Sequence, residues 1–150
     1  MKNKKHESGR SMVEMVGVLA VMGLITAGAF VLLRGGMSSQ KRNRVQDEIG
    51  NIASIVRTSS ASLADFSNLP KSDVCKKGDP TFLANLDVQT ATPFGGDTVY
   101  VVCQGEKNNF VVQIVNIDAK DCEALAQLGW AEGVAACDAK AETFSVEYGK

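Results

Sequence analysis

The chain has 150 residues, of which 45% are apolar and 22% are charged, and its formal net charge is −1. This composition is ordinary for a folded protein and excludes wholesale disorder, and the length suits one modest domain plus an anchor. The near-neutral charge, without a basic stripe interleaved with aromatic residues, argues against a nucleic-acid partner.

A short basic segment precedes a glycine at the beginning of the chain. Before Gly9 the sequence contains three lysines and one acidic residue, and the chain's only histidine, His6, also lies in this segment. If the chain is cut after Gly9, the mature protein contains no imidazole. That loss excludes histidine acid–base catalysis, cysteine–histidine nucleophiles and histidine-containing zinc sites, so the chain is not expected to be an enzyme.

An apolar stretch follows, reading MVEMVGVLAVMGLITAGAFVLL over residues 12–33. As a helix these residues cover about 33 Å, which is enough to cross the hydrocarbon core of a bilayer. The basic leader predicts a cytoplasmic N-terminus and export of residues 35–150. Glu14 is the only charge in the stretch, and an ionisable group at mid-bilayer costs about 2.5–3.5 kcal/mol, which indicates a function for it.

Two other interpretations of this stretch remain open. One is a secretory signal peptide cut after Ala27-Gly28-Ala29, an A-x-A site whose use would release a binding module that begins at Phe30. The other is an uncleaved single-span anchor in which Glu14 is incidental. The position of Glu14 inside the stretch and the apolar continuation over residues 30–33 both argue against the signal peptide.

The segment Ser8-Gly9-Arg10-Ser11-Met12-Val13-Glu14 resembles the class III signal of type IV pilins and type II secretion pseudopilins. These families share a basic leader, a glycine at the cut, an apolar helix and a glutamate at the fifth mature position. The resemblance implies that a prepilin peptidase removes the leader, residues 1–9, and N-methylates Arg10, which stands where phenylalanine or methionine is usual. It also implies that residues 10–34 form the transmembrane and filament-core helix. Glu14 would then pair with the N-terminal amine of a neighbouring subunit and set the axial register.

An amphipathic helix is predicted to continue this stretch to about residue 64 as part of the exported head, residues 35–150. Gly35-Gly36 is the expected point of melting or kinking, because glycine costs about 1 kcal/mol in a helix interior. Beyond it one apolar stripe is expected to pack on the head's own sheet. The stripe residues recur at steps of three or four, namely Val45, Ile49, Ile52, Ile55 and Val56.

Beyond Phe66 the composition turns polar and predicts short elements. Asp79-Pro80 resembles a helix start for residues 81–86, with Asp79 as N-cap and Pro80 at the first helical position. Pro93-Phe94-Gly95-Gly96 indicates a turn. A short helix is expected after Asp118 as N-cap, with Cys122, Leu125, Ala126 and Leu128 on its inward face. The expected strands are 98–104, 110–117 and 143–148, the first two joined by a hairpin connection over 105–109.

The four cysteines, Cys75, Cys103, Cys122 and Cys137, include no C-x-x-C pair, so a zinc ribbon or a thioredoxin-like site is not expected. Their even number in an exported chain indicates disulfides formed in an oxidising compartment. Three pairings are possible. The pairing Cys75–Cys103 with Cys122–Cys137 is favoured because each bond closes a local loop, and a buried free thiol is the alternative.

The order of long helix, loop, hairpin, short helix and closing strand also resembles the pilins. The expected fold is therefore α+β, with a long N-terminal helix packed on a small antiparallel sheet. The turn at Pro93–Gly96 and the strand that leads into the helix of Cys122 look like the type IVb group. That resemblance implies that Cys122–Cys137 closes a C-terminal disulfide loop, with residues 123–136 exposed and in contact with other subunits.

The expected function is that of a structural subunit of a type IV pilus, held first in the bacterial inner membrane and later in a cell-surface filament. Because the chain has no phosphate-cradling loop, an ATPase and an inner-membrane assembly platform are expected partners, beside the prepilin peptidase and other copies of the chain. A pseudopilin of type II secretion is the alternative. No cofactor or metal is expected, since the spacing of Asp118, Asp121 and Glu123 fits no EF-hand.

Overall fold

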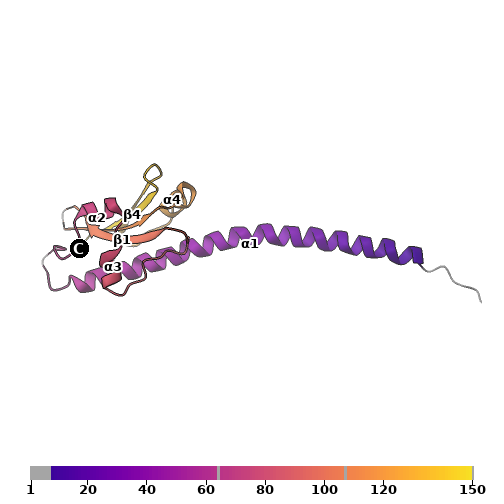
Figure 1. Cartoon of the computed structure of the whole chain (residues 1–150), viewed down its shortest axis with the longest axis horizontal. Helices are drawn as coiled ribbons and strands as arrows, with labels where there is room; N and C mark the ends of the chain where they lie inside the picture. The colour runs from indigo at the N-terminus through magenta and orange to yellow at the C-terminus, as the bar shows by residue number, and fades with distance from the viewer. Residues whose placement is uncertain (1–7, 64, 107, 150) are drawn as a thin grey trace, which may run out of the picture. The chain divides into compact units, whose positions relative to one another are not determined.

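The computed structural model describes residues 8–63, 65–106 and 108–149, and for residues 8–11 and 30–37 it describes the backbone alone. Over these residues the chain is α+β, and it divides into two compact units between residues 40 and 41 (Figure 1). The elements are α1 (Ser8–Ser59), α2 (Ser72–Lys77), α3 (Thr81–Asn85), β1 (Val99–Gln104), β2 (Phe110–Val115), α4 (Ala119–Ala126), β3 (Gly133–Asp138) and β4 (Thr143–Tyr148).

The first helix, α1, contains none of the chain's three prolines, and its backbone is helical through Gly35-Gly36, where the sequence predicted melting or kinking. It ends at Ser59, before the predicted end near residue 64, which lies outside the described residues. The hydroxyls of Thr58 and Ser59 donate to the carbonyl oxygens of Ser54 and Val56, each at 2.9 Å. Such hydrogen bonds from a side chain back to the helix compete with the next turn, which explains the earlier end.

A four-stranded antiparallel sheet forms the centre of the second unit, with the strand order β1-β2-β4-β3. Strand β4 has the predicted bounds, whereas β1 begins one residue later than predicted and β2 ends at Val115 rather than Ile117. The edge strand β3 was not predicted. Its sequence, GVAACD, is dominated by small residues of low strand propensity, so pairing with β4 decides its conformation.

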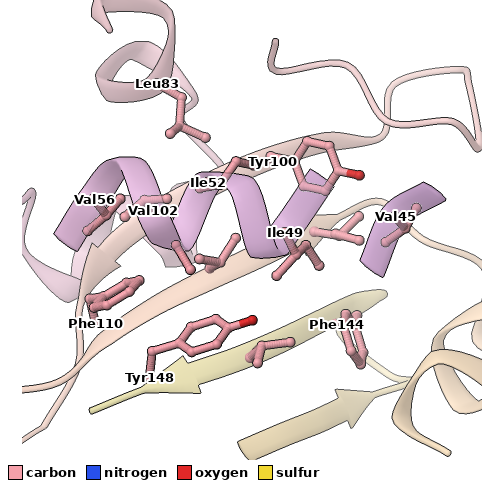
Figure 2. Packing of buried hydrophobic residues seen from close by; sticks show 14 of the residues in the cluster. Val45, Ile49, Ile52, Val56, Leu83, Tyr100, Val102, Phe110, Phe144 and Tyr148 are labelled. Carbon is pink, nitrogen blue, oxygen red and sulfur yellow. The ribbon is translucent and has the colours of Figure 1, made fainter. Parts of the chain in front are cut away.

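The main core lies between residues 45–56 of α1 and one face of this sheet (Figure 2). Val45, Ile49, Ile52 and Val56 are each at most 2% exposed, which confirms the predicted stripe, while Ile55 is only half-buried. Each fully buried side chain of this kind contributes about 1.5–3 kcal/mol. The stripe meets the inward-facing residues of the sheet, namely Tyr100, Val102, Phe110, Val112, Ile114, Phe144, Val146 and Tyr148.

A smaller apolar cluster covers the opposite face of β1 and β2, where α2 packs (Figure 1). Its buried members are Cys75 of α2 with Val101, Cys103 and Val115, and for this reason the middle of β1 is buried on both faces. Helix α2 was not predicted, although its ends carry helix signals: Asp73 in the first turn, two lysines in the last, and Gly78 at a φ of 68° directly after it. Six residues are too few to show a helical period.

The two remaining short helices begin near the predicted residues. The N-cap position of α3 is occupied by Pro80 and not by the predicted Asp79, so the helix begins one residue later than predicted. Asp79 still supports the start of the helix, because the backbone N–H and the hydroxyl of Thr81 both donate to its Oδ1. Asp118 occupies the N-cap position of α4, but its carboxylate makes no capping hydrogen bond. Of the predicted inward residues of α4, Cys122 and Leu125 are fully buried, which confirms them. Ala126 is only half-buried, and Leu128 lies beyond the end of the helix and is also half-buried.

Polar contacts hold α1 to the sheet beside its apolar stripe. Glu48 accepts a hydrogen bond from the hydroxyl of Tyr100 at 2.7 Å. It also forms an ion pair at 2.9 Å with Arg44, one turn earlier on α1. In the last turn of α1, Arg57 pairs with Glu132 at 2.7 Å and lies over the ring of Tyr148. These contacts fix the rotation of the helix about its own axis as well as its distance from the sheet.

Gly133 is required by close packing in β3. A Cβ atom at this position would lie 2.5 Å from Cγ1 of Val146 and 2.9 Å from Cε1 of Tyr148, whereas a Cβ at the exposed, helical Gly50 would meet nothing within 4 Å. We therefore expect Gly133→Ala to lower the free energy of unfolding by about 1–3 kcal/mol through overpacking. Gly50→Ala should raise it by about 0.5–1 kcal/mol. Urea unfolding of the full chain in detergent, followed by the fluorescence of Trp130, measures both. Equal effects of the two substitutions would contradict this packing.

Tyr100 predicts a pH dependence of stability. Burial, and next the hydrogen bond to Glu48, raise the pKa of Tyr100 well above its ordinary value of about 10. Because the folded chain keeps this proton and the unfolded chain releases it above about pH 10, the stabilisation is complete below that pH and is lost as the pH rises. Tyr100→Phe should cost about 1 kcal/mol near pH 8 and should lose stability less steeply than the parent above about pH 10. Denaturant unfolding across this range tests the claim, and parallel pH profiles would contradict it.

Candidate functional site

The candidate functional site is the apolar part of α1. Residues Met12–Ala29 are long and apolar enough to cross a membrane by length and composition, and none of this stretch is buried inside the protein. Its large apolar side chains are between 57% and 76% exposed. As a helix, 18 residues cover about 27 Å, close to the thickness of a hydrocarbon core. Contiguous apolar surface of this extent is a contact surface for lipid or for protein.

Glu14 lies in the first turn of this stretch, and its side chain is exposed. Among the side chains that the structure describes, none donates a hydrogen bond or an ion pair to its carboxylate. Gly9 and Arg10 lie in the first turn of α1, of which the structure describes the backbone. The helix therefore brings the three predicted processing and assembly residues together at its beginning, with Arg10 and Glu14 one helical turn apart.

The other polar side chain of the stretch, Thr26, has internal partners. Its hydroxyl donates to the carbonyl oxygen of Met22 at 2.6 Å and also lies 3.2 Å from that of Gly23. This back-bonding satisfies the hydroxyl without a second molecule. Glu14 thus differs from Thr26, because no side chain that the structure describes pairs with its carboxylate, and a carboxylate removed from water needs a partner.

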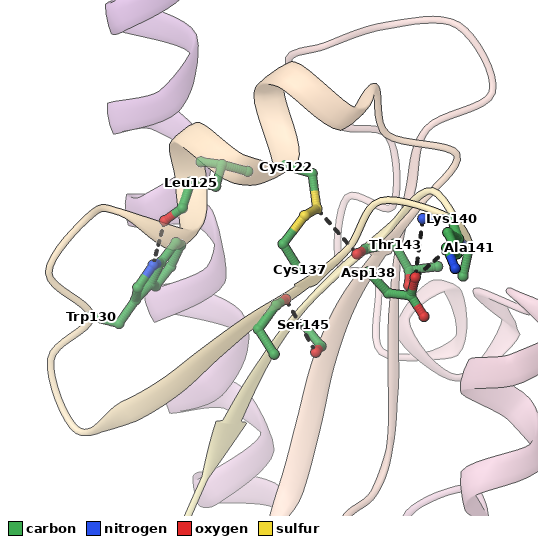
Figure 3. The surroundings of a disulfide bond; sticks show 10 residues. Cys122, Leu125, Trp130, Cys137, Asp138, Lys140, Ala141, Thr143 and Ser145 are labelled. Carbon is green, nitrogen blue, oxygen red and sulfur yellow. Dashed lines mark hydrogen bonds between the residues drawn. A yellow bond between two sulfur atoms is a disulfide. The ribbon is translucent and has the colours of Figure 1, made fainter.

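Both of the favoured disulfides are present. Cys75–Cys103 joins α2 to β1, and Cys122–Cys137 joins α4 to β3. Figure 3 shows the second bond beneath α4, with Sγ of Cys122 at 3.2 Å from the carbonyl oxygen of Thr143. Each bond thus attaches a short helix to an edge strand of the sheet. Neither helix is long enough to be stable alone.

Residues 123–136 differ from the exposed loop that was expected, because they contain the end of α4 and the beginning of β3. Leu125 is fully buried, and Trp130 is half-buried with its ring 5.3 Å from that of Phe144. The indole N–H of Trp130 donates to the carbonyl oxygen of Leu125 at 2.9 Å (Figure 3). The outward surface of this segment is carried by β3, where Val134 is 74% exposed.

An open cavity of about 270 Å³ lies at one end of the sheet, beside the beginning of α4. Three carboxylates line it, those of Asp118, Asp121 and Glu142, together with Lys41, and Asp121 also lies 3.4 Å from the guanidinium of Arg42. Within the described ranges, no group of three or more histidine, cysteine, aspartate or glutamate side chains is arranged to hold a metal ion.

A groove of about 250 Å³ runs along α1 and is lined by polar and apolar side chains of α1 and of residues 86–89. Sequence reasoning did not anticipate this groove or the links from Glu48 and Arg57 to the sheet, since all of them depend on tertiary contacts.

Comparisons with protein-family models, with curated proteins and with solved structures find no match to this chain. The functional assignment therefore depends on the chemistry of α1 and on the fold of the second unit.

The two disulfides are predicted to have separable effects. In the chain-entropy treatment, a bond with a sequence separation of 15 contributes about 3 kcal/mol and one with a separation of 28 about 3.6 kcal/mol. Replacing Cys122 and Cys137 by serine should also shift the emission of Trp130, whose indole is anchored to α4. Replacing Cys75 and Cys103 should lower stability and leave that emission unchanged. Fluorescence and denaturant unfolding of both double variants test this, and an emission shift in the Cys75–Cys103 variant would contradict it.

Proposed function

We propose that this chain is a structural subunit of a type IV pilus filament, of the type IVb kind. It is made as an inner-membrane precursor with a cytoplasmic N-terminus and is trimmed after Gly9 by a prepilin peptidase. An assembly platform and its ATPase then add it to a filament through residues 10–34. The observation that carries this proposal is Glu14, a carboxylate at the head of an exposed apolar helix, five positions after the glycine and without a partner among the side chains that the structure describes.

The apolar side chains of residues 12–29 are exposed, and contact between apolar surface and water is unfavourable. Each Å² of apolar surface removed from water is worth about 25 cal/mol, so residues 12–29 must be covered by lipid before assembly and by other subunits after it. Hydrophobic attraction alone does not fix the axial alignment of neighbouring subunits, whereas an ion pair made by Glu14 does. The α-amine that cleavage creates on a neighbouring Arg10 supplies the positive partner that a buried carboxylate needs.

The second unit suits the exported head of such a subunit. Its two disulfides fit an oxidising compartment, and the apolar stripe of α1 packs on an antiparallel sheet of the same unit, an arrangement compatible with a pilin-like fold. The exposed edge strand β3 and the turn before β1 supply surfaces for contact between heads.

Two other functions remain to be separated from this one by experiment. A type II secretion pseudopilin would have the same processing signal and would form no long surface filament. A binding module released after Ala29 would lose residues 12–29 of the apolar stretch. Electron microscopy of cells that produce the chain separates the first, and the length of the exported protein separates the second.

Replacing Glu14 tests the proposal. Glu14→Ala should leave the chain folded and in the membrane fraction, because the substitution makes the stretch more apolar, but should abolish filaments because the register contact is lost. The matched control is Glu106→Ala, which removes an exposed carboxylate from the connection between β1 and β2. Fractionation with electron microscopy measures both. Normal filaments from Glu14→Ala would refute the assembly role.

A further inference from the structure

We propose that the disulfide Cys122–Cys137 is a site of covalent modification by a small-molecule thiol, which attaches to Cys137 and leaves Cys122 as a buried thiol. The other disulfide, Cys75–Cys103, stays intact under the same conditions. All four cysteines lie in the second unit, so this inference does not depend on the function proposed for the apolar part of α1.

The two disulfides differ in how deeply their cysteines are buried. Cys75 and Cys103 are 5% and 2% exposed and belong to the smaller apolar cluster beneath α2. Cys122 is fully buried, whereas Cys137 is only half-buried. Because thiol–disulfide exchange begins when a thiolate reaches a sulfur atom, access to the cysteine limits the rate. Cys137 is therefore the cysteine that a dissolved thiolate reaches most readily.

The strands that carry Cys103 and Cys137 are both at edges of the sheet, but only the edge at Cys103 is covered. Along β1, the backbone N–H groups of Tyr100 and Gln104 donate to the carbonyl oxygens of Thr90 and Pro70. Along β3, no described segment other than β4 forms a backbone hydrogen bond with the strand. The approach to Cys137 from the free edge of β3 is thus less obstructed than the approach to Cys103.

The sulfur atom that leaves during the exchange has a polar partner already in place. Sγ of Cys122 lies 3.2 Å from the carbonyl oxygen of Thr143, the first residue of β4 (Figure 3). In the disulfide this sulfur carries no proton, but as a thiol it is a hydrogen-bond donor. A buried donor without an acceptor costs free energy, so the carbonyl of Thr143 lowers the cost of a thiol at Cys122.

The exchange balances without an added oxidant. The small thiolate attacks Sγ of Cys137, a bond forms between these two sulfur atoms, and the bond from Cys137 to Cys122 breaks. The electron pair leaves with Sγ of Cys122, which takes up through the solvent the proton that the attacking thiol released. The products are a mixed disulfide at Cys137 and a thiol at Cys122. Only a thiolate attacks a disulfide, and a buried thiol is mostly protonated, which slows the reverse attack by Cys122.

The modification changes the attachment of α4 to the edge of the sheet. The bond between Cys122 and Cys137 joins α4 to β3, which is otherwise held by pairing with β4. Trp130 lies between the two cysteines in the sequence, and its indole N–H donates to the carbonyl oxygen of Leu125 on α4. The fluorescence of Trp130 therefore reports the loss of this bond.

Exchange with free cysteine tests the inference. The oxidised, full-length chain in detergent is incubated with isotope-labelled cysteine at about pH 8, where part of a free thiol is ionised. The reaction is quenched with acid, and peptides are identified by mass spectrometry. We expect the label on Cys137, a free thiol at Cys122 and an intact Cys75–Cys103 bond, with a shift in Trp130 emission that follows the amount of label.

Two single variants provide a matched comparison. Cys122→Ser leaves Cys137 as a free thiol and supplies a hydroxyl that donates to the carbonyl of Thr143, whereas Cys103→Ser leaves Cys75 as a free thiol. A soluble disulfide reagent should modify Cys137 about tenfold faster than Cys75, because a buried thiol reacts only when the structure opens locally. If either variant fails to fold, the exchange in the unmodified chain decides.

Three results would overturn the inference: label on Cys122 rather than Cys137, exchange of both disulfides at the same rate, or no label at any concentration of cysteine that leaves the chain folded. In urea both disulfides should react with the labelled cysteine. Selectivity that persisted in urea would also overturn the inference, because it would not come from the fold.

Discussion

The folded unit depends on the burial of one stripe of α1, from Val45 to Val56, against the inner face of the sheet. These side chains and their partners on β1, β2 and β4 form the main core. Among the residues that the structure describes, α2, a helix of six residues that a disulfide holds in place, covers the outer face of the sheet over β1 and β2. If the stripe were lost, neither the short helices nor the half-covered sheet would bury enough apolar surface to remain folded.

The same helix has a different character before residue 30. Over residues 12–29 apolar side chains surround the helix on all sides, whereas over residues 45–56 they form one stripe. The change in pattern separates a part whose apolar surface needs an external partner from a part that is satisfied within the chain. In a soluble monomer, the apolar surface of residues 12–29 would remain exposed to water. The proposed function gives it two partners in succession, first lipid and then other copies of the chain.

The sequence was sufficient to predict the elements whose pattern is strong and local. The stripe of α1 and strand β4 were predicted because their apolar residues recur with the helical and the strand period. Of the three possible disulfide pairings, the one favoured because its loops are short is confirmed. Helix α2 and strand β3 were missed because one is too short to show a period and the other has side chains too small to show a preference. Tertiary contacts create both elements, since Cys75 ties α2 to β1 and pairing with β4 orders β3.

The candidate site was predictable in part for a related reason. Gly9, Arg10 and Glu14 form a linear motif, so the sequence alone places them together. The contacts between Glu48 and Tyr100, and between Arg57 and Glu132, join residues that are 52 and 75 positions apart. No local pattern marks such pairs.

The central claim is that residues 10–34 remain on the chain after export and hold subunits together. N-terminal sequencing of filaments sheared from the surface of cells that produce this protein tests it most directly. We predict that the filament protein begins at Arg10. Filament protein that begins at Phe30, or surface material that retains Met1, would contradict the account.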